Sequence, residues 1–358
     1  MRLRNTIIRQ RQSNIELLRI LLILGIILLH YNNVGIGKAF YYVDYNSFNY
    51  VLLHIFESVA IVGVDLFVLV SGYFLCRDEQ RDYMKPLQLI LQVIIFSVAI
   101  YLCKIGVGKA VFNLKSLVGC LIPKNYFVSL YSALYLISPY INVVLRQLSE
   151  KEFKRLLVLM LLLFSVWPTM MDIVNLFVKQ PLLGTSTIGL WGSQDGYTIV
   201  NFCLMYVLGA YMSCRGGQIN RKYTWSGMFV VIVLLNVWSY FDMGTAWEYC
   251  NPLVIIESCL IFVLFKDMNI PFSRILNRIS KGCFTVFLTH ATFFRYLHIE
   301  EYINQSTFVM LGHLFGSCIL LFVIGYLIFE AYDFVMRKVF RLLQLRSVPI
   351  KYFDKESL

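Results

Sequence analysis

The sequence predicts an all-α, polytopic integral membrane protein, a bundle of about ten transmembrane helices. Of its 358 residues, 58% are hydrophobic and 15% are charged, and the mean hydropathy is +0.67. Soluble domains are nearer half apolar and a quarter charged. The apolar residues also fall into ten runs whose lengths approach the ~20 residues that a helix needs to cross a bilayer.

The ten runs follow one another along most of the chain. They cover residues 14–34, 53–75, 86–106, 127–146, 154–171, 197–213, 225–241, 250–266, 282–298 and 307–336. An even number of crossings places both termini on one side. We therefore expect one transmembrane domain over residues 1–336 and a basic cytoplasmic tail, residues 337–358, on the inner leaflet.

Lysine and arginine decide which side the termini occupy. If the N-terminus is cytoplasmic, the inside segments hold 24 of these residues and the outside loops hold 7. Positive residues concentrate on the cytoplasmic side, so both ends are predicted to be cytoplasmic in a protein of the cell (inner) membrane. The same distribution accounts for the net charge of +11 without a nucleic-acid partner.

The nine cysteines are scattered, and no two form a Cys-x-x-Cys pair. Most lie in apolar runs, where free cysteine behaves as a small buried residue. We therefore expect no metal site and no disulfide framework.

The first span carries three ionisable residues, Glu16, Arg19 and His30. The step from Arg19 to His30 ends ~20° from a whole number of helical turns and rises ~16 Å, so both side chains share one face. Glu16 lies three residues before Arg19 and is expected to neutralise it as an ion pair. Ionisable residues inside a span are costly, and a functional role is the default interpretation.

An arginine followed after ten residues by a histidine, in an opening helix that begins Asn14-Ile15-Glu16-Leu17-Leu18-Arg19, resembles the integral-membrane acyltransferase family 3. Members acylate sugars of surface polysaccharides and related acceptors. The resemblance implies an acyl-coenzyme A co-substrate, most simply acetyl-coenzyme A, with no bound cofactor.

The second span contains a further stretch that resembles the family, residues 62–73, with Asp65 and Ser71-Gly72. An unpaired carboxylate at mid-membrane is improbable, so Asp65 is expected to pair with His30 or Arg19. Ser71-Gly72 is interpreted as a close-packing point between helices rather than a nucleophile, since no base stands beside it in sequence.

The segment after the second span contains Arg77, Arg81 and Lys85. In the family this region shows paired arginines three apart, whereas here the spacing is four. These cations are donor-binding candidates, because they suit the phosphates of coenzyme A. The positive-inside rule alone would also place them here.

Three more residues are possible site-lining groups. Tyr126 stands where the family usually has tryptophan, at the start of the fourth span, and could equally be an interfacial belt residue. His290 ends a stretch, residues 285–290, that matches the family, and Glu257 is a buried carboxylate with no matching motif. Together with Glu16 and Ser71 they complete the candidate site.

Two outside stretches are long, residues 107–126 and 172–196. The second is rich in Gly, Ser and Thr and includes Trp191, so it is either a lid or acceptor-binding loop or a solvated connector.

These features predict a membrane-bound O-acyltransferase that moves an acyl group from acyl-coenzyme A to a hydroxyl of a surface polysaccharide or lipid-linked sugar. His30 is the general base, Asp65 its orienting partner, and Arg19 binds the donor's phosphates or acyl carbonyl. The alternative is a transporter or flippase of a lipid-linked sugar, in which the buried ionisable residues line a pathway. A third alternative is an inactive scaffold in a polysaccharide-assembly complex.

Overall fold

The computed structural model describes residues 11–77, 82–217 and 219–342, and within these ranges the chain is helical and contains no strand. The helices, in chain order, are α1 Ser13–Asn32, α2 Ala39–Tyr42, α3 Phe48–Ala60, α4 Gly63–Leu75, α5 Met84–Gly106, α6 Leu114–Cys120, α7 Tyr126–Gln147, α8 Glu150–Leu161, η1 Leu162–Val166, α9 Trp167–Val178, η2 Gln194–Gly196, α10 Ile199–Cys214, α11 Arg221–Phe241, α12 Met243–Ala246, α13 Pro252–Lys266, α14 Arg274–Thr289, η3 His290–Tyr296, α15 Ile299–Tyr302 and α16 Thr307–Leu342.

Seven helical segments in the described part of the chain are long and apolar enough to cross a bilayer, which confirms the all-α membrane architecture. They are Ser13–Asn32, Phe48–Leu75, Met84–Gly106, Tyr126–Gln147, Glu150–Val178, Arg221–Phe241 and Thr307–Val339. The three remaining predicted runs overlap α10, α13 and α14, of 16, 15 and 16 residues, and the last run begins within α14 and continues into η3. A total of about ten spans therefore stays a prediction.

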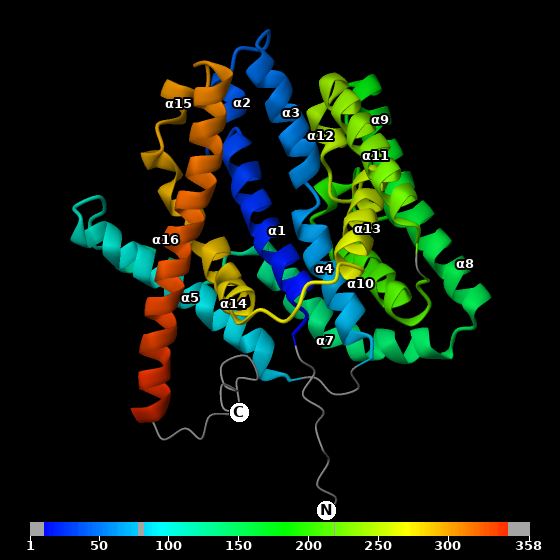
Figure 1. Ribbon diagram of the computed structural model, residues 1–358, viewed down its shortest axis with the longest axis horizontal. Helices are drawn as coiled ribbons and strands as arrows, with labels where there is room; N and C mark the ends of the chain where they lie inside the picture. Colours follow the sequence, from blue (N-terminus) through cyan, green and yellow to red (C-terminus); the bar gives the residue numbers. More distant parts are fainter. Residues whose placement is uncertain (1–10, 78–81, 218, 343–358) are drawn as a thin grey trace, which may run out of the picture.

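Helix α1 lies inside the bundle, against α3, α4, α13, α14 and α16 (Figure 1). Its sequence is apolar nearly all round, and Ile15, Leu18, Ile23 and Ile27 are at most 2% exposed. A helix that is apolar on every side is stable where neighbours cover it on every side. The ionisable residues of α1 are thereby carried into the interior.

Helices α4 and α10 cross at two glycines. A Cβ added to Gly72 would overlap the backbone carbonyl of Tyr206, and one added to Gly209 would overlap the carbonyl of Leu69. Small residues let membrane helices approach to backbone contact. This confirms that the Ser71-Gly72 pair marks a close-packing point.

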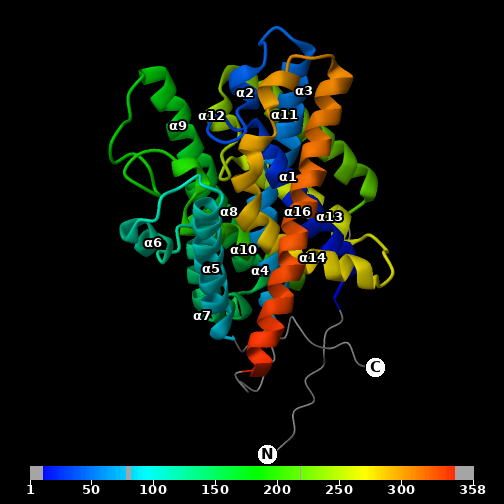
Figure 2. The same cartoon turned by 90° about the vertical axis from the view of Figure 1, so that its left-hand side faces the viewer.

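Helices α1 and α14 contact each other along much of their lengths, and α16 packs against both of them (Figures 1 and 2). A Cβ at Gly325 of α16 would lie 2.8 Å from the Cα of Val286, so α16 approaches α14 closely. The first turn of α1 and the last turn of α16 lie at the same end of the bundle (Figure 1). Residues 343–358 of the predicted tail lie outside the described residues.

The long stretch after α9 folds back onto that helix. The backbone N–H of Ser193 donates to Asp172 at 2.7 Å, and the indole of Trp167 donates to the carbonyl of Thr185 at 2.8 Å. The N–H of Tyr249 then donates to the carbonyl of Asp195 at 3.1 Å. The stretch, which leads from α9 to α10, is thus bonded both to α9 and to the segment before α13.

Candidate active site

The end of α1 brings His30 against His290, the residue at which α14 gives way to the 3₁₀ turns of η3. His30 Nδ1 lies 2.6 Å from His290 Nε2, and the two rings are nearly parallel with centroids 4.8 Å apart. His290 Nδ1 lies 2.9 Å from the carbonyl oxygen of Val286. Two of the predicted site residues, 260 positions apart in sequence, therefore form one pair.

The Val286 carbonyl fixes the protons of this pair. A carbonyl oxygen only accepts, so His290 Nδ1 carries the hydrogen and donates to it. The neutral His290 ring then accepts at Nε2, and His30 donates to it from Nδ1. His30 Nε2 is left with its lone pair, which is the form in which an imidazole accepts a proton.

Aromatic rings enclose the pair. Phe294 lies edge-on to both imidazoles, with centroids 6.5 Å from His30 and 6.1 Å from His290, and Phe287 lies 6.2 Å from His290. His290 is 1% exposed, whereas His30 is half-buried. Of the two histidines, His30 is therefore the more exposed.

At the opposite end of α1, the predicted Glu16–Arg19 ion pair is confirmed. Arg19 Nη1 lies 3.1 Å from Glu16 Oε1, and Arg11 Nη1 lies 3.5 Å from Glu16 Oε2. The hydroxyl of Ser280 on α14 also donates to Glu16. Glu16 and His30 thus both contact the α14–η3 segment.

Asp65 has a different partner from those predicted. The Nδ2 of Asn201 on α10 donates to Asp65 Oδ1 at 3.0 Å, and Asp65 Oδ2 has no hydrogen-bond partner. The expected pairing with His30 or Arg19 is therefore wrong. The reason is the close α4–α10 crossing, which turns the first turn of α4 toward α10 while η3 occupies the side of His30.

Ser71 donates to the carbonyl of Phe67, one turn earlier, at 2.9 Å and lies 3.2 Å from the hydroxyl of Tyr131. Neither partner is a base, so the local geometry does not activate Ser71 as a nucleophile. Tyr126 contacts the ring of Tyr197 edge to face, with centroids 4.6 Å apart. Glu257 is fully buried, and neither of its carboxyl oxygens has a hydrogen-bond partner.

Of the predicted donor-binding segment, Arg77 donates to the backbone carbonyl of Ser213 and Lys85 lies over the ring of Tyr135, whereas Arg81 lies outside the described residues. A cavity of about 260 Å³ adjoins this segment. Its lining is Cys76, Asn142, Leu145, Arg146, Phe153, Ala210, Cys214 and Arg215. Arg146 and Arg215 are cations that the sequence did not single out, because charges at span ends are expected anyway.

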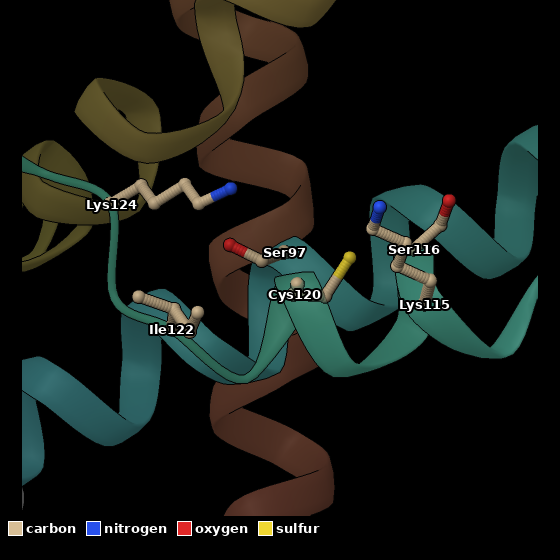
Figure 3. Close-up of a pocket in the computed structure, with 7 residues that line it drawn as sticks. Ser97, Lys115, Ser116, Cys120, Ile122 and Lys124 are labelled. Carbon is tan, nitrogen blue, oxygen red and sulfur yellow. The ribbon is translucent and has the colours of Figure 1, made fainter.

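A larger cavity, about 430 Å³, lies between α5 and α6, away from the residues considered above. Ser97 of α5 faces it, with Lys124 on one side and Ser116 on the other (Figure 3). It adjoins the first long stretch, residues 107–126, which contains α6.

Sequence reasoning missed two bonds next to His30. The hydroxyl of Tyr31 lies 2.8 Å from Nδ1 of His313 on α16, and Asn32 Nδ2 donates to Glu57 Oε2 on α3 at 2.8 Å. Glu57 and His313 both lie in apolar runs, so the signal that drew attention to Glu257 was present for them as well.

A family model described as an acyltransferase domain matches residues 12–330, a range that contains both His30 and His290. The chain belongs to the integral-membrane acyltransferase family 3. Neither the curated proteins nor the solved structures contain a match. Membership, together with the apolar helices, makes the protein a membrane acyltransferase.

Proposed function

We propose that this acyltransferase moves an acyl group, acetyl in the simplest case, from acyl-coenzyme A to a hydroxyl of a surface polysaccharide or lipid-linked sugar. The observation that carries the proposal is the neutral His30–His290 pair, which leaves His30 Nε2 as a proton acceptor. A histidine base is suited to the proton of an acceptor hydroxyl near neutral pH.

In the proposed reaction, the acceptor oxygen attacks the carbonyl carbon of the thioester while His30 Nε2 takes the hydroxyl proton. The carbon–sulfur bond then breaks, and the imidazolium returns that proton to the coenzyme A sulfur. The positive charge that forms on His30 is shared through Nδ1–H with His290, which is held by Val286. His290 thus replaces Asp65 as the orienting partner of the base, in the way that an acid orients histidine in hydrolytic triads.

The donor's phosphates are proposed to bind at the other end of the bundle, near Arg77, Arg146 and Arg215. Arginine suits phosphate because its guanidinium offers several N–H groups in a plane. The 260 Å³ cavity beside these residues supports the assignment. Arg19 remains a donor-side candidate, since its guanidinium side chain is about a quarter exposed, at 25%.

The transporter alternative is supported by the unpartnered Glu257, because a buried carboxyl group in a span is typical of an ion pathway. Mass spectrometry of surface glycans, with and without the gene, separates the two functions. An acyltransferase changes the repeat unit by the mass of one acyl group, whereas loss of a flippase reduces the amount of glycan without that change.

The active-site proposal is tested by His30→Ala. Acyl content should fall by about 10²–10⁴-fold, the contribution of a general base, while the variant still inserts in the membrane. Near-normal acylation by this variant would remove His30 from the mechanism.

We also propose an inner-membrane location with both termini cytoplasmic, which the charge asymmetry supports. A reporter fused after Leu358 should then be cytoplasmic, and one inserted near Gly192 should be external. The opposite result at either position would reverse the assignment of the donor and acceptor sides.

A further inference from the structure

We propose that His313 is a positioning residue that sets the separation of His30 and His290. The inference rests on the proposed function, in which His30 is the base. Tyr31 follows His30 directly, and its hydroxyl lies 2.8 Å from His313 Nδ1. His313 Nε2 lies 2.9 Å from the carbonyl oxygen of Leu297, the residue that follows η3. Because η3 begins with His290, one side chain joins the segments that carry both histidines.

The direction of these bonds follows from the same rule as before. The Leu297 carbonyl only accepts, so His313 Nε2 carries the hydrogen. Nδ1 of the neutral ring then accepts from the Tyr31 hydroxyl. The ring of Tyr302 is stacked on His313, with centroids 4.2 Å apart and planes at 3°, and this holds the imidazole plane. His313 is thus fixed in orientation and uses both nitrogens.

The last turn of α1 is held from three directions. Successive helical residues are ~100° apart, so the side chains of His30, Tyr31 and Asn32 point to different neighbours. Their partners are His290 at the start of η3, His313 on α16 and Glu57 on α3. Asn32 and Tyr31 are 0% exposed. The helix therefore resists rotation about its axis, and His313 adds the connection to the far end of η3.

The spacing matters because the His30–His290 bond is short. Hydrogen bonds weaken steeply when the two heavy atoms separate or the angle is lost, and a displacement of about 1 Å near a reacting group can cost about 10²-fold in rate. Without His313, α1 and η3 keep their apolar packing but lose the polar connection that sets their distance.

The test uses purified full-length protein in detergent and diethyl pyrocarbonate as the probe. The reagent transfers a carbethoxy group to an unprotonated ring nitrogen and releases ethanol and carbon dioxide, so its rate at His30, followed by peptide mass spectrometry against pH, reports the protonation of that ring. Three variants each remove a different hydrogen-bonding group from the Tyr31–His313–Leu297 connection. Tyr31→Phe removes the hydroxyl, His313→Gln keeps a donor for Leu297 but loses the Nδ1 acceptor, and His313→Asn does the reverse.

At the pH where modification of His30 in the wild type is half-maximal, each variant should change the modification rate by about tenfold. Each should also lower acyl content about tenfold, the effect of one buried hydrogen bond. In a His290→Ala background the pair is already absent, so Tyr31→Phe and His313→Gln should have no further effect on the His30 profile. Tyr41→Phe, at an exposed tyrosine 69% accessible, is the matched control and should change nothing.

An unchanged His30 profile in Tyr31→Phe and His313→Gln would overturn the proposal, as would a shift that is equally large in the His290→Ala background. Tyr31→Phe removes a single oxygen and keeps the test valid if variants of His313 do not accumulate. Because carbethoxylation does not require acyl transfer, an altered profile in a protein without acyltransferase activity would reject the proposed function and leave the positioning role intact.

Discussion

The two ends of α1 hold polar groups in opposite ways. At one end, Arg11 and Arg19 share Glu16, and both guanidinium side chains are about a quarter exposed, at 24% and 25%. At the other, His30 is bonded to His290 as a neutral pair, and His290 is 1% exposed. The two guanidinium groups, which share the buried Glu16, remain partly accessible to water or lipid headgroups, whereas the buried His290 is neutral.

The difference has a chemical meaning. A base must present a lone pair, and the protonated form of a buried imidazole is costly in apolar surroundings. Phe287 and Phe294 beside the histidines therefore favour the neutral form that accepts a proton. The Glu16 end, where the side chains of Arg11 and Arg19 are partly exposed, suits the anionic end of a donor instead.

The largest effect is expected from removing the polar contact at the His30 end. His290→Phe keeps a ring of similar width but offers no nitrogen to His30, so both the tautomer and the orientation of the base are lost. We expect acyl transfer to fall by about 10²-fold, the lower end of the range for acid–base catalysis. The measurement is acyl content of the surface glycan at equal protein level. An active His290→Phe protein would mean that His30 needs no partner.

The Glu16 end should respond in stability rather than in chemistry. Glu16→Gln leaves Arg11 and Arg19 without their shared negative charge. Breaking a buried pair costs about 3–5 kcal/mol, and the partial exposure of the arginines reduces this to about 2 kcal/mol. A lower melting temperature in detergent should result.

Glu150→Gln is the control for this substitution. It breaks the Lys154–Glu150 pair of 2.6 Å, in which both side chains are more than half exposed. Exposed pairs of this kind contribute little, so its melting temperature should stay near that of the wild type. Equal losses in both variants would contradict the contrast between buried and exposed pairs.

A smaller effect is expected from Arg19→Lys. The ammonium still pairs with Glu16 but offers no planar set of N–H groups. Affinity for acyl-coenzyme A should fall by a few fold, whereas Arg19→Ala should weaken it by about tenfold or more. Calorimetric binding to the purified proteins would decide, and equal affinities across the three would leave Arg19 a topological anchor.

Glu248 lies between α12 and α13 and is 4% exposed, and it should affect the pH dependence of stability rather than acyl transfer. Burial raises its pKa from 4.5 to about 9, with Asp172 and Asp195 adding to the shift. The folded protein thus holds a proton that the unfolded chain releases above about pH 4.5. Stability should be highest below that pH and fall as the pH rises toward about 9, by up to about 1.4 kcal/mol per unit.

Glu248→Gln removes this titration, so its melting temperature should depend less on pH than that of the wild type between pH 5 and 9. If the melting temperatures of the two proteins change equally with pH over this range, Glu248 is not the group responsible for the pH dependence. Glu248 and Glu16 thus differ, because Glu16 is ionised between two arginines whereas burial holds Glu248 in its neutral form.

Much of the candidate site follows from single-helix geometry. The three-residue step from Glu16 to Arg19 predicts an ion pair, and the structure contains it. The Gly72 contact was also foreseen, because a small residue beside a serine in a span is typical of close packing. Asp65 was assigned the wrong partner, since its neighbour Asn201 is 136 positions away and nothing local in either helix identifies the other.

The sequence by itself determined that this is a helical membrane protein of the acyltransferase family 3 and that Arg19 and His30 share one face of the first helix. The fold class and the shared face depend on hydropathy, charge and helical periodicity, which are local, whereas the family follows from the motifs that resemble it and from the match of the family model. The tertiary structure alone decided that His30 meets His290, that Tyr31 meets His313 and that Asp65 meets Asn201. These partners lie far apart in the chain, and their meeting depends on which helices pack together, which apolar runs of similar composition do not specify.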